Sequence, residues 1–263
     1  MTVPKISIIM PVKNRQKEIV EAIRSVIDQT FQDWELLVID DRSTDKTAQV
    51  VKTFENPRIK YFYLAKGTGP GAGRDFGIRK AQGEIIVLAD SDDINYPERL
   101  SLTDDYFQRN PEIDIVYGRS ERLEVKTGKI SSRPTCDFDR ILLKAYNFIS
   151  NVTAAFKKEP YLKTSGYDQK IKTSEDYDLW LTFLEAGFHF GFIDKSLVLQ
   201  KIHPESLTSK TDFKERKKNL AYVRQKHHLA VPKPEQVKKL VDQELWNFIF
   251  TPRGKEFWFG LKS

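Results

Sequence analysis

Three aspartates stand within four consecutive positions of this sequence, Asp90, Asp92 and Asp93, directly after the apolar run "EIIVLA". Like charges this close raise one another's pKa and cost free energy unless a positive group lies among them. Mg²⁺ and Mn²⁺ prefer carboxylate ligands and also bind diphosphate oxygens, so such an ion could stabilise a departing diphosphate. Alternatively, the aspartates only cap the helix that Pro97 opens or lie in a solvated loop. The spacing excludes an EF-hand calcium loop, which needs a glycine and a terminal glutamate.

Polar residues also follow two other apolar runs. Pro11 and Asn14 end or follow "KISIIMPV", and Asp41 follows "WELLVID". An acidic side chain at the latter position can accept hydrogen bonds from a nucleotide's base or ribose. The segment "GTGPGAGRDFGI" fits no G-x-G-x-x-G frame, because Arg74 occupies the last position, so the dinucleotide fingerprint is absent. Arg74 is then either a ligand for phosphate, ribose or base, or an ordinary helix-surface arginine.

The elements that must position these residues follow from hydrophobic periodicity. Apolar, β-branched runs predict strands over 5–12, 34–40, 58–64 and 84–89. Between them, periodic patterns predict a helix through 19–27, one carrying Val50, Val51 and Phe54 with Ser43 or Thr44 as its N-cap, and one over 71–81. Repeated βα units with buried strands predict an α/β fold with a doubly wound, mostly parallel sheet flanked by helices. Ligands bind at the carboxyl ends of such strands, where the polar residues collect.

The pattern becomes mixed after about residue 100. We expect helices over 97–110 and 174–187, and short strands around 113–118, 151–156, 189–194 and 196–203. The sequence shows no internal repeat and no low-complexity segment.

With these residues assembled, the chain resembles the glycosyltransferase family 2 enzymes, which have the GT-A fold. The matching motifs stand in the family's order: "ISIIMPVKN", "QTFQDWELLVIDDRSTDKT", "GRDFGIRKAQGEIIVLADSDD", "YPERL", "SEDYDLWL" and "HPESLT". The resemblance covers roughly residues 4–209. It implies a hexosyltransferase-like, inverting, metal-dependent enzyme that moves a sugar from a nucleotide-diphosphate donor, UDP-sugar first, to an acceptor hydroxyl. The acceptor would be a glycan or a lipid-linked sugar, as in polysaccharide, lipopolysaccharide or other cell-surface glycan synthesis.

The resemblance also implies roles for single residues on the donor side. Asp93 would be a ligand of Mn²⁺ or Mg²⁺, and Asp92 would reach the ribose or the metal. Asp90 would pair with Asp92 in a D-x-D motif or only end the strand. The nucleotide pocket would be lined by Pro11, Asn14, Asp41 and Arg74.

On the acceptor side, the acidic pair of "SEDYDLWL" matches the family's catalytic carboxylates. Asp176 would remove the acceptor proton, and Glu175 would help to hold the acceptor or the base. Alternatively, both residues only stabilise the dipole of the helix that they open. His203 matches a histidine that lies near the metal or diphosphate in some relatives, and a structural role is the alternative.

The sequence departs from the family pattern at four places, which limits how far the family's residue roles apply to this chain. Lys13 stands where relatives commonly have a tyrosine beside the base, which leaves the nucleotide open. Arg42 replaces a usual glycine. The other two departures are Gly73 with Asp75 around Arg74, in place of alanine and asparagine, and Gln200 with Lys201 before the histidine, in place of tyrosine and arginine.

The charge is uneven along the chain. Residues 210–263 contain 13 Lys/Arg and 6 Asp/Glu, and the rest is nearly neutral, which argues against a nucleic-acid-binding core. We therefore expect a GT-A catalytic domain over 1–209, with a nucleotide-binding half (1–100) and an acceptor-binding half (101–209), and a basic helical extension over 210–263. No apolar run approaches the roughly 20 residues of a membrane span and no signal-peptide pattern opens the sequence, so a cytoplasmic protein is expected.

Six aromatic residues near the end of the extension stand among lysines and arginines: Trp246, Phe248, Phe250, Phe257, Trp258 and Phe259. This mixture suits peripheral contact with the inner face of the cell membrane, and packing on the catalytic domain is the alternative. Co-sedimentation with liposomes, with and without residues 240–263, distinguishes the two. Two other function classes stay open: a catalytically silent nucleotide-sugar-binding subunit and a nucleotidyltransferase. The missing phosphate loop after the first strand counts against the latter.

Overall fold

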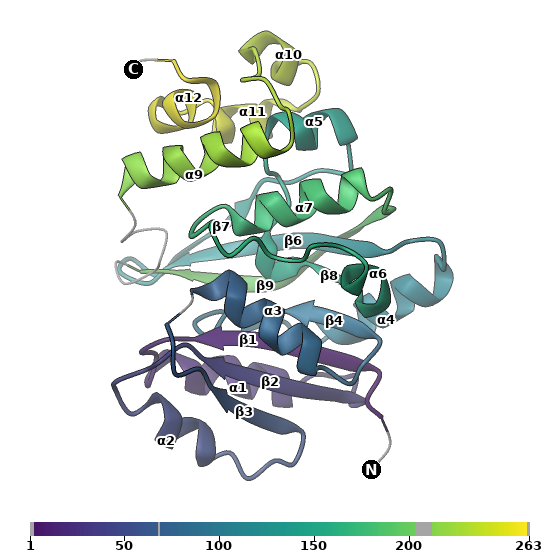
Figure 1. The fold of residues 1–263 in the computed structure, drawn as a ribbon, viewed down its shortest axis with the longest axis vertical. Coiled ribbons are helices and arrows are strands. Elements are labelled where there is room, and N and C mark those ends of the chain that lie inside the picture. Colours follow the sequence, from purple (N-terminus) through teal and green to yellow (C-terminus); the bar gives the residue numbers. More distant parts are fainter. Residues whose placement is uncertain (1–2, 68, 204–211, 262–263) are drawn as a thin grey trace.

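A mixed sheet of nine strands organises the computed structural model, which describes residues 3–67, 69–203 and 212–261 (Figure 1). The strand order is β3-β2-β1-β4-β8-β6-β9-β5, and β7 pairs with β6 outside this path. The strands are Ile6–Val12 (β1), Trp34–Asp40 (β2), Ile59–Tyr63 (β3), Ile85–Leu88 (β4), Ile94–Asn95 (β5), Ile115–Glu124 (β6), Lys129–Arg133 (β7), Ala155–Lys157 (β8) and Phe190–Ile202 (β9).

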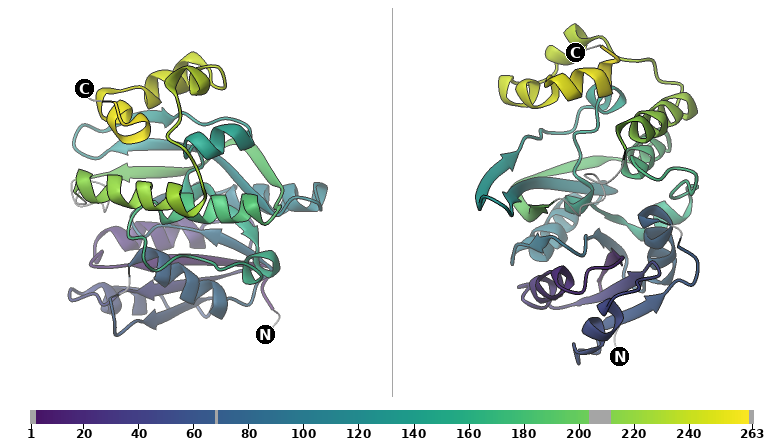
Figure 2. Two further views of the ribbon diagram at one scale, coloured as in Figure 1. Left: turned by 45° about the horizontal axis from the view of Figure 1, so that its top comes forward. Right: turned by 90° about the vertical axis from the view of Figure 1, so that its left-hand side faces the viewer.

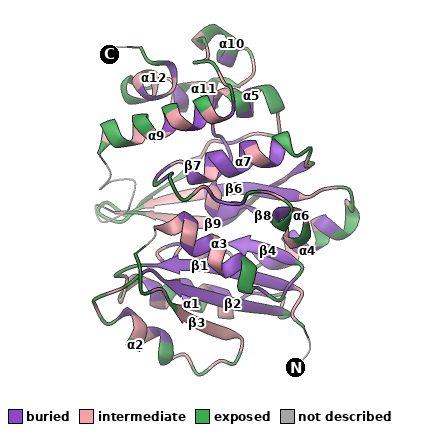
Figure 3. Ribbon diagram, in the orientation of Figure 1, coloured by how far each residue is buried: buried purple, intermediate pink, exposed green. Residues whose placement is uncertain are grey.

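The N-terminal half of the sheet is parallel, and the second half adds both parallel and antiparallel pairs. Each of β1 and β2 is buried over its whole length (Figure 3). Their successive apolar residues belong to two separate core clusters. Ile8 packs in the layer beneath α1 and α4, whereas Ile9 packs in the layer beneath α3 and α7. The predicted fold class, an α/β fold with helices on both faces of a mostly parallel sheet, is confirmed.

The helices that flank the sheet follow the predicted order, with several short ones added. They are Glu18–Ile27 (α1), Thr47–Lys52 (α2), Pro70–Lys80 (α3), Arg99–Arg109 (α4), Arg140–Ala145 (α5), Asn151–Thr153 (η1, a 3₁₀ turn), Lys158–Leu162 (α6), Glu175–Glu185 (α7), Phe213–Lys226 (α9), Pro234–Lys238 (α10), Gln243–Ile249 (α11) and Pro252–Phe259 (α12).

A glycine brings α3 unusually close to the sheet. A Cβ atom placed on Gly77 would lie 2.8 Å from Ile9 Cγ2 and 3.1 Å from Ile39 Cγ1, closer than ordinary contacts allow. Gly77 therefore lets the helix rest directly on β1 and β2. Arg74 lies three residues earlier, on the same side of the helix, and is buried by this approach.

The structure differs from three predictions of local structure. Neither Ser43 nor Thr44 caps a helix, because α2 begins only at Thr47 and ends before Phe54. The predicted strand over 151–156 is a 3₁₀ turn followed by the short strand β8. The two strands predicted over 189–203 form one strand, β9, whose register with β6 shifts between Gly118 and Ser120.

The C-terminal helices α9 to α12 gather at the end of the molecule opposite β3 and α2 (Figure 1 and the right-hand view of Figure 2). None of the six aromatic side chains is exposed, and Phe257 and Phe259 belong to the same apolar core as α7. The Trp258 ring lies 4.8 Å from that of Tyr146, edge to face. These aromatic residues thus pack on the body, and membrane contact stays a prediction.

Nothing in the described residues tests the expected division of the chain, because its boundary at 209/210 falls within 204–211. The described helices include none that is long and apolar enough to span a membrane.

A buried ion cluster fastens α9 to α7. Asp178 has no exposed surface and contacts His227 Nε2 at 2.9 Å and Lys226 Nζ at 2.8 Å. His227 Nδ1 also lies 2.9 Å from Glu185 Oε1. Burial alone would lower the pKa of His227, but the two carboxylates outweigh it and raise that pKa above 6.5. The C-terminal segment is therefore tied to the helix whose first turn carries Glu175 and Asp176.

Candidate active site

A cleft of about 1000 Å³ opens at the carboxyl ends of β1, β2 and β4. It gathers almost all the residues that the sequence singled out, and its lining includes Pro11, Asn14, Asp41, Arg74, Asp90, Asp92, Asp93, Glu175 and Asp176. His203 does not line the cleft but contacts one of these residues, Asp92. The rest of the motif "HPESLT" lies outside the described residues.

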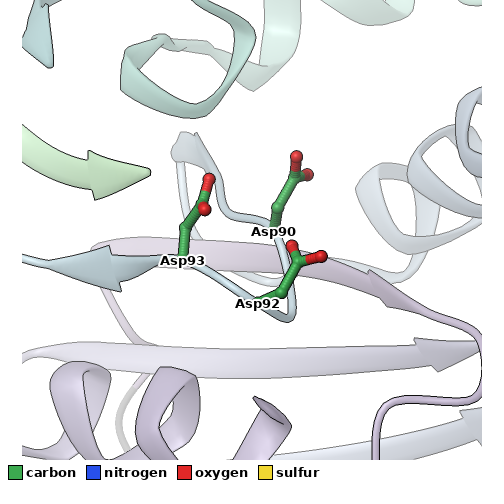
Figure 4. A group of neighbouring side chains, drawn as sticks. All are labelled: Asp90, Asp92 and Asp93. Carbon is green, nitrogen blue, oxygen red and sulfur yellow. The ribbon is translucent and has the colours of Figure 1, made fainter. Parts of the chain in front are cut away.

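The three aspartates of the β4–β5 loop converge (Figure 4). Each offers a carboxylate oxygen, and these oxygens all lie within 4.8 Å of one another. Burial, and then the charges of Asp90 and Asp92, raise the pKa of Asp93 well above its usual range. Asp93 Oδ1 accepts a single backbone hydrogen bond, from Lys201 at 2.9 Å. Because three carboxylates converge here and the buried Asp93 forms no ion pair among the described residues, the cluster fits a hard divalent cation.

A buried arginine lies behind this cluster. Arg99 Nη2 donates to the carbonyl of Leu88 at 2.7 Å, and Nη1 bonds Asn95. Burial lowers the pKa of Arg99 to about 9, although Asp90 and Asp93 oppose the change. Arg99 thus orders the strand end beneath the aspartates but forms no ion pair with them among the described residues.

Asp92 connects the cluster to two other parts of the chain. Its Oδ2 accepts from Arg15 Nε at 3.2 Å, which brings in the loop after β1. The same oxygen lies 3.0 Å from His203 Nε2, just after β9. His203 therefore lies beside the aspartate cluster, and its role at a metal stays a prediction.

Asn14 holds the loops after β1 and β2 together. It has a left-handed backbone (φ 52°), and its N–H donates to Ser43 Oγ at 2.9 Å. Its side-chain oxygen accepts from the Thr44 N–H at 2.8 Å. Ser43 and Thr44 are thus used to join two loops, which explains why neither caps α2. Arg42, at φ 63°, adopts a conformation that glycine takes freely, in agreement with the family's usual glycine there.

Asp41 is buried next to Lys13, the residue that stands where relatives commonly have a tyrosine. Lys13 Nζ lies 3.6 Å from Asp41 Oδ2, and the Gly69 N–H donates to the same oxygen at 3.2 Å. Asp41 therefore links the loop after β1 to the start of α3, within the cleft lining.

Arg74 joins the aspartate cluster to the acidic pair of α7. Its Nη2 donates to Asp90 Oδ1 at 2.7 Å and its Nη1 to Glu175 Oε1 at 2.9 Å. The side chain is only 4% exposed, so the alternative of a helix-surface arginine is wrong. Asp90 likewise does more than end the strand, because it belongs to the carboxylate cluster and holds Arg74.

The first turn of α7 presents two carboxylates to the cleft. Burial raises the pKa of Glu175 to about 7, against the opposing charge of Arg74. Burial also raises the pKa of Asp176, whose oxygens accept from the Tyr177 N–H at 2.8 Å and from Asn147 Nδ2 at 3.1 Å. Because these two donors fix its position, Asp176 is an oriented carboxylate at the surface of a cavity.

Sequence reasoning missed one wall of the cleft entirely. It consists of basic, amide and aromatic residues from β6, β7, the end of α5 and the C-terminal helices: Arg122, Arg133, Tyr146, Asn147, Arg216, Phe248, Phe257 and Trp258. The aromatic residues of the extension were noticed, but no spacing connects them to the arginines of β6 and β7.

Known proteins share both the sequence pattern and this architecture. Residues 7–162 match the family described as glycosyl transferase family 2. The putative colanic acid biosynthesis glycosyl transferase WcaA of Escherichia coli is 31% identical over 212 residues, which cover 77% of this chain and 74% of that protein.

Two solved structures share the fold at low identity. S. aureus TarS 1–349 in complex with UDP-GlcNAc has a TM-score of 0.70 at 20% identity, covering 96% of this chain and 75% of that chain. The match spans only 45% of a longer TarS chain. The mannosyltransferase PcManGT of Pyrobaculum calidifontis, in complex with GDP-Man and Mn²⁺, has a TM-score of 0.65 at 16% identity, covering 97% and 72%.

Proposed function

This chain belongs to glycosyl transferase family 2 and has a GT-A fold, and we propose that it is an inverting, metal-dependent enzyme that transfers a sugar from a nucleotide-diphosphate donor to an acceptor hydroxyl. One observation carries the proposal: an aspartate cluster fit for a divalent cation and an oriented Asp176 line the same cleft. Arg74 connects the two groups through Asp90 and Glu175.

The donor side is assigned to the loops after β1, β2 and β4. Asp93 and Asp92 would hold Mn²⁺ or Mg²⁺, with His203 against Asp92, and the bound ion would stabilise negative charge on the departing diphosphate. The nucleoside would lie against Pro11, Asn14 and Asp41. UDP is the first candidate, since the TarS structure holds UDP-GlcNAc. The nucleotide stays open, because PcManGT holds GDP-Man and because Lys13, which contacts Asp41 here, stands where relatives commonly have a tyrosine.

The acceptor side is assigned to α7. Asp176 would accept the proton of the acceptor hydroxyl while that oxygen bonds to the anomeric carbon of the donor sugar. The bond from this carbon to the diphosphate oxygen breaks, the nucleoside diphosphate leaves, and attack from the opposite face inverts the configuration. A raised pKa strengthens Asp176 as a base, and Glu175, held by Arg74, would position the acceptor or Asp176 itself.

The biological setting is proposed from the relatives. WcaA is named for colanic acid biosynthesis and another relative is a chondroitin synthase, which supports a role in polysaccharide or other cell-surface glycan synthesis.

A thermal-shift screen tests the donor half of the proposal. UDP-, GDP- and dTDP-sugars are each added with Mn²⁺, with Mg²⁺ or with a chelator. At 100 times Kd a ligand adds about 2.7 kcal/mol to the free energy of unfolding, so the correct donor should raise the Tm by roughly 5–10 °C, and only with metal.

The outcomes separate the other function classes. No metal-dependent shift with any nucleotide sugar would contradict the proposal. Donor binding without release of nucleoside diphosphate to any acceptor would favour a silent subunit, and release of diphosphate from a nucleoside triphosphate would favour a nucleotidyltransferase.

A further inference from the structure

Three arginines line the cleft on the side built by the second half of the chain: Arg122 of β6, Arg133 of β7 and Arg216 of α9, here called the arginine wall. In the β6–β7 ladder Arg133 stands opposite Ser120, two residues from Arg122, so the two arginines are diagonal neighbours on one face. The positive charge of the wall is thus concentrated by strand pairing.

None of the three guanidinium groups forms an ion pair with a carboxylate among the described residues. The Nε atoms of Arg122 and Arg133 are buried without a hydrogen-bond partner. By contrast, Arg74 holds two carboxylates, and the buried Arg224 donates to the carbonyl of Trp258 at 2.7 Å.

The lowered pKa values of two of these arginines show that their charged form is disfavoured in the folded protein. Burial, and then the charge of Arg133, lower the pKa of Arg122 to about 10, and burial followed by Arg253 lowers the pKa of Arg216. Arginine side chains stay cationic at neutral pH even when burial lowers their pKa in this way. Unpaired, partly buried charges destabilise the folded state, and a bound anion would remove that cost.

Aromatic rings contact two of the three arginines, Arg122 and Arg216. The guanidinium carbon of Arg122 lies 5.0 Å from the centre of the Phe248 ring, and that of Arg216 lies 5.1 Å from the centre of Phe257. Such contacts fix a guanidinium and leave its N–H groups able to donate. Phe248, Phe257 and Trp258 also line the cleft, and aromatic faces pack well against the C–H groups of a sugar ring.

The arginine wall lies on the same side of the cleft as Asp176, the proposed base. The charge of Arg133 lowers the pKa of Asp176 and so opposes the effect of burial. Tyr146, which lines the same side of the cleft, directly precedes Asn147, and Asn147 donates a hydrogen bond to Asp176. A group bound at the wall would therefore lie beside the position assigned to the acceptor.

We propose that the arginine wall binds an acceptor that carries an oxyanion, a phosphate or a carboxylate, next to the sugar that receives the transferred residue. Two or three guanidinium groups hold the oxyanion by charge-assisted hydrogen bonds, and the neighbouring aromatic side chains pack on the sugar ring. The inference deepens the proposed function and rests on it, because it takes Asp176 as the mark of the acceptor side.

Three matched probes test the wall: glucose 1-phosphate, glucuronate and glucose. Binding is measured by tryptophan fluorescence and saturation-transfer NMR, both with the donor site filled by UDP and Mn²⁺ and with it empty. We expect both anionic sugars to bind at least about tenfold more tightly than glucose, and this preference to fall in 0.5 M NaCl. The tighter of the two identifies phosphate or carboxylate as the natural oxyanion.

Variants locate the binding. Arg122→Gln and Arg133→Gln should each weaken anionic-sugar binding about tenfold, while Arg133→Lys retains part of it. Arg109→Gln, at an exposed surface position of α4, is the matched control and should change nothing. Circular dichroism and the Tm of each variant establish that it is folded, and UDP binding with Mn²⁺ should be equal in all of them.

Each remaining outcome has a distinct meaning. Equal binding of glucose and the anionic sugars overturns the inference and leaves the proposed function standing. Weaker binding of UDP-glucuronate, but not of UDP-glucose, by the Gln variants also overturns it, because the wall would then serve the donor sugar. Anionic-sugar binding at the wall without any binding of nucleotide diphosphate contradicts the proposed donor chemistry instead.

Discussion

Arg74 Nη1 lies 2.9 Å from Glu175 Oε1, and this contact joins residues 101 positions apart in the chain. Since the same guanidinium also holds Asp90, the loop that carries the proposed metal ligands and the helix that carries the proposed base share one buried cation. Displacing either element would leave a charge unpaired, so their separation is fixed before any substrate binds.

Replacing Arg74 should therefore damage both stability and activity. Arg74→Met leaves two carboxylates without their cation, which should lower the free energy of unfolding by about 3 kcal/mol, as measured by urea denaturation. Arg74→Lys should recover part of the stability but little activity, because one ammonium cannot bridge both partners with the same geometry. Arg79→Met, which removes the ion pair of an exposed arginine with the half-buried Asp75, is the control and should cost less than about 1 kcal/mol.

Asp93 should control metal-dependent donor binding. Asp93→Ala removes a buried carboxylate of the cluster, so calorimetric binding of UDP should no longer differ between Mn²⁺ and chelator. The Tm without metal should rise or stay unchanged, because a repelled, buried charge is lost. Asp105→Asn, on the exposed face of α4, should bind as the unaltered protein does. Metal-dependent binding that persists in Asp93→Ala would refute this role.

Asp176 should be needed for transfer but not for binding. Asp176→Asn keeps the size of the side chain and removes the base, so kcat should fall by about 10²–10⁴-fold. Donor affinity, measured by calorimetry with Mn²⁺, should change less than threefold. Full transfer activity in this variant would end the base assignment and leave the helix-dipole role as the explanation.

The acidic pair predicts opposite pH dependences for activity and stability. Because burial raises the pKa of Glu175 to about 7, kcat/KM should rise as pH increases through about 7, and Glu175→Gln should move this limb to lower pH. Because the pKa of Glu175 is higher in the folded state, folding favours its protonated form. The contribution of Glu175 to stability is therefore fully present below pH 4.5, its ordinary pKa, and is lost as pH rises through about 7. Tm against pH, beside the rate profile, checks both signs.

The His227 cluster should make the attachment of α9 pH-dependent. Because the folded pKa of His227 is raised above 6.5, its contribution to stability is complete below pH 6.5 and disappears as pH rises through the folded value. His227→Asn should thus lower the Tm by about 5 °C at pH 5.5 and by less at pH 8.5. His228→Asn, at the exposed neighbouring position, should show no such difference. An equal loss at both pH values would contradict the charged contact with Asp178.

The strands and loops of the proposed donor side could be predicted from the sequence, because each follows from a local hydrophobic pattern. The predicted strand "WELLVID" coincides with β2, and the aspartate cluster follows β4 directly. The cap of α2 could not be predicted, since Ser43 is taken by a hydrogen bond to Asn14, 29 residues away. Serine is a common helix N-cap, but the Ser43 hydroxyl accepts a hydrogen bond from the Asn14 N–H instead of capping α2.

The arginine wall has no local signal at all. Arg122 and Arg133 are ordinary strand residues until β7 folds back on β6, and Arg216 reaches the cleft only because α9 docks on α7. The six aromatic residues were visible in the sequence, but their partners were not, since Trp258 packs on Tyr146 more than a hundred positions earlier. Contacts of this range depend on the completed fold.

The docking of the C-terminal helices has a consequence for how such a protein can diversify. Residues 7–162 match the family, whereas Arg216, Phe248, Phe257 and Trp258 lie beyond that range. Under the proposed function, the C-terminal helices therefore complete an acceptor side that Arg122 and Arg133 of the family-matched segment begin. Exchange of these helices would alter one part of the proposed acceptor side and leave the loops after β1, β2 and β4 unchanged.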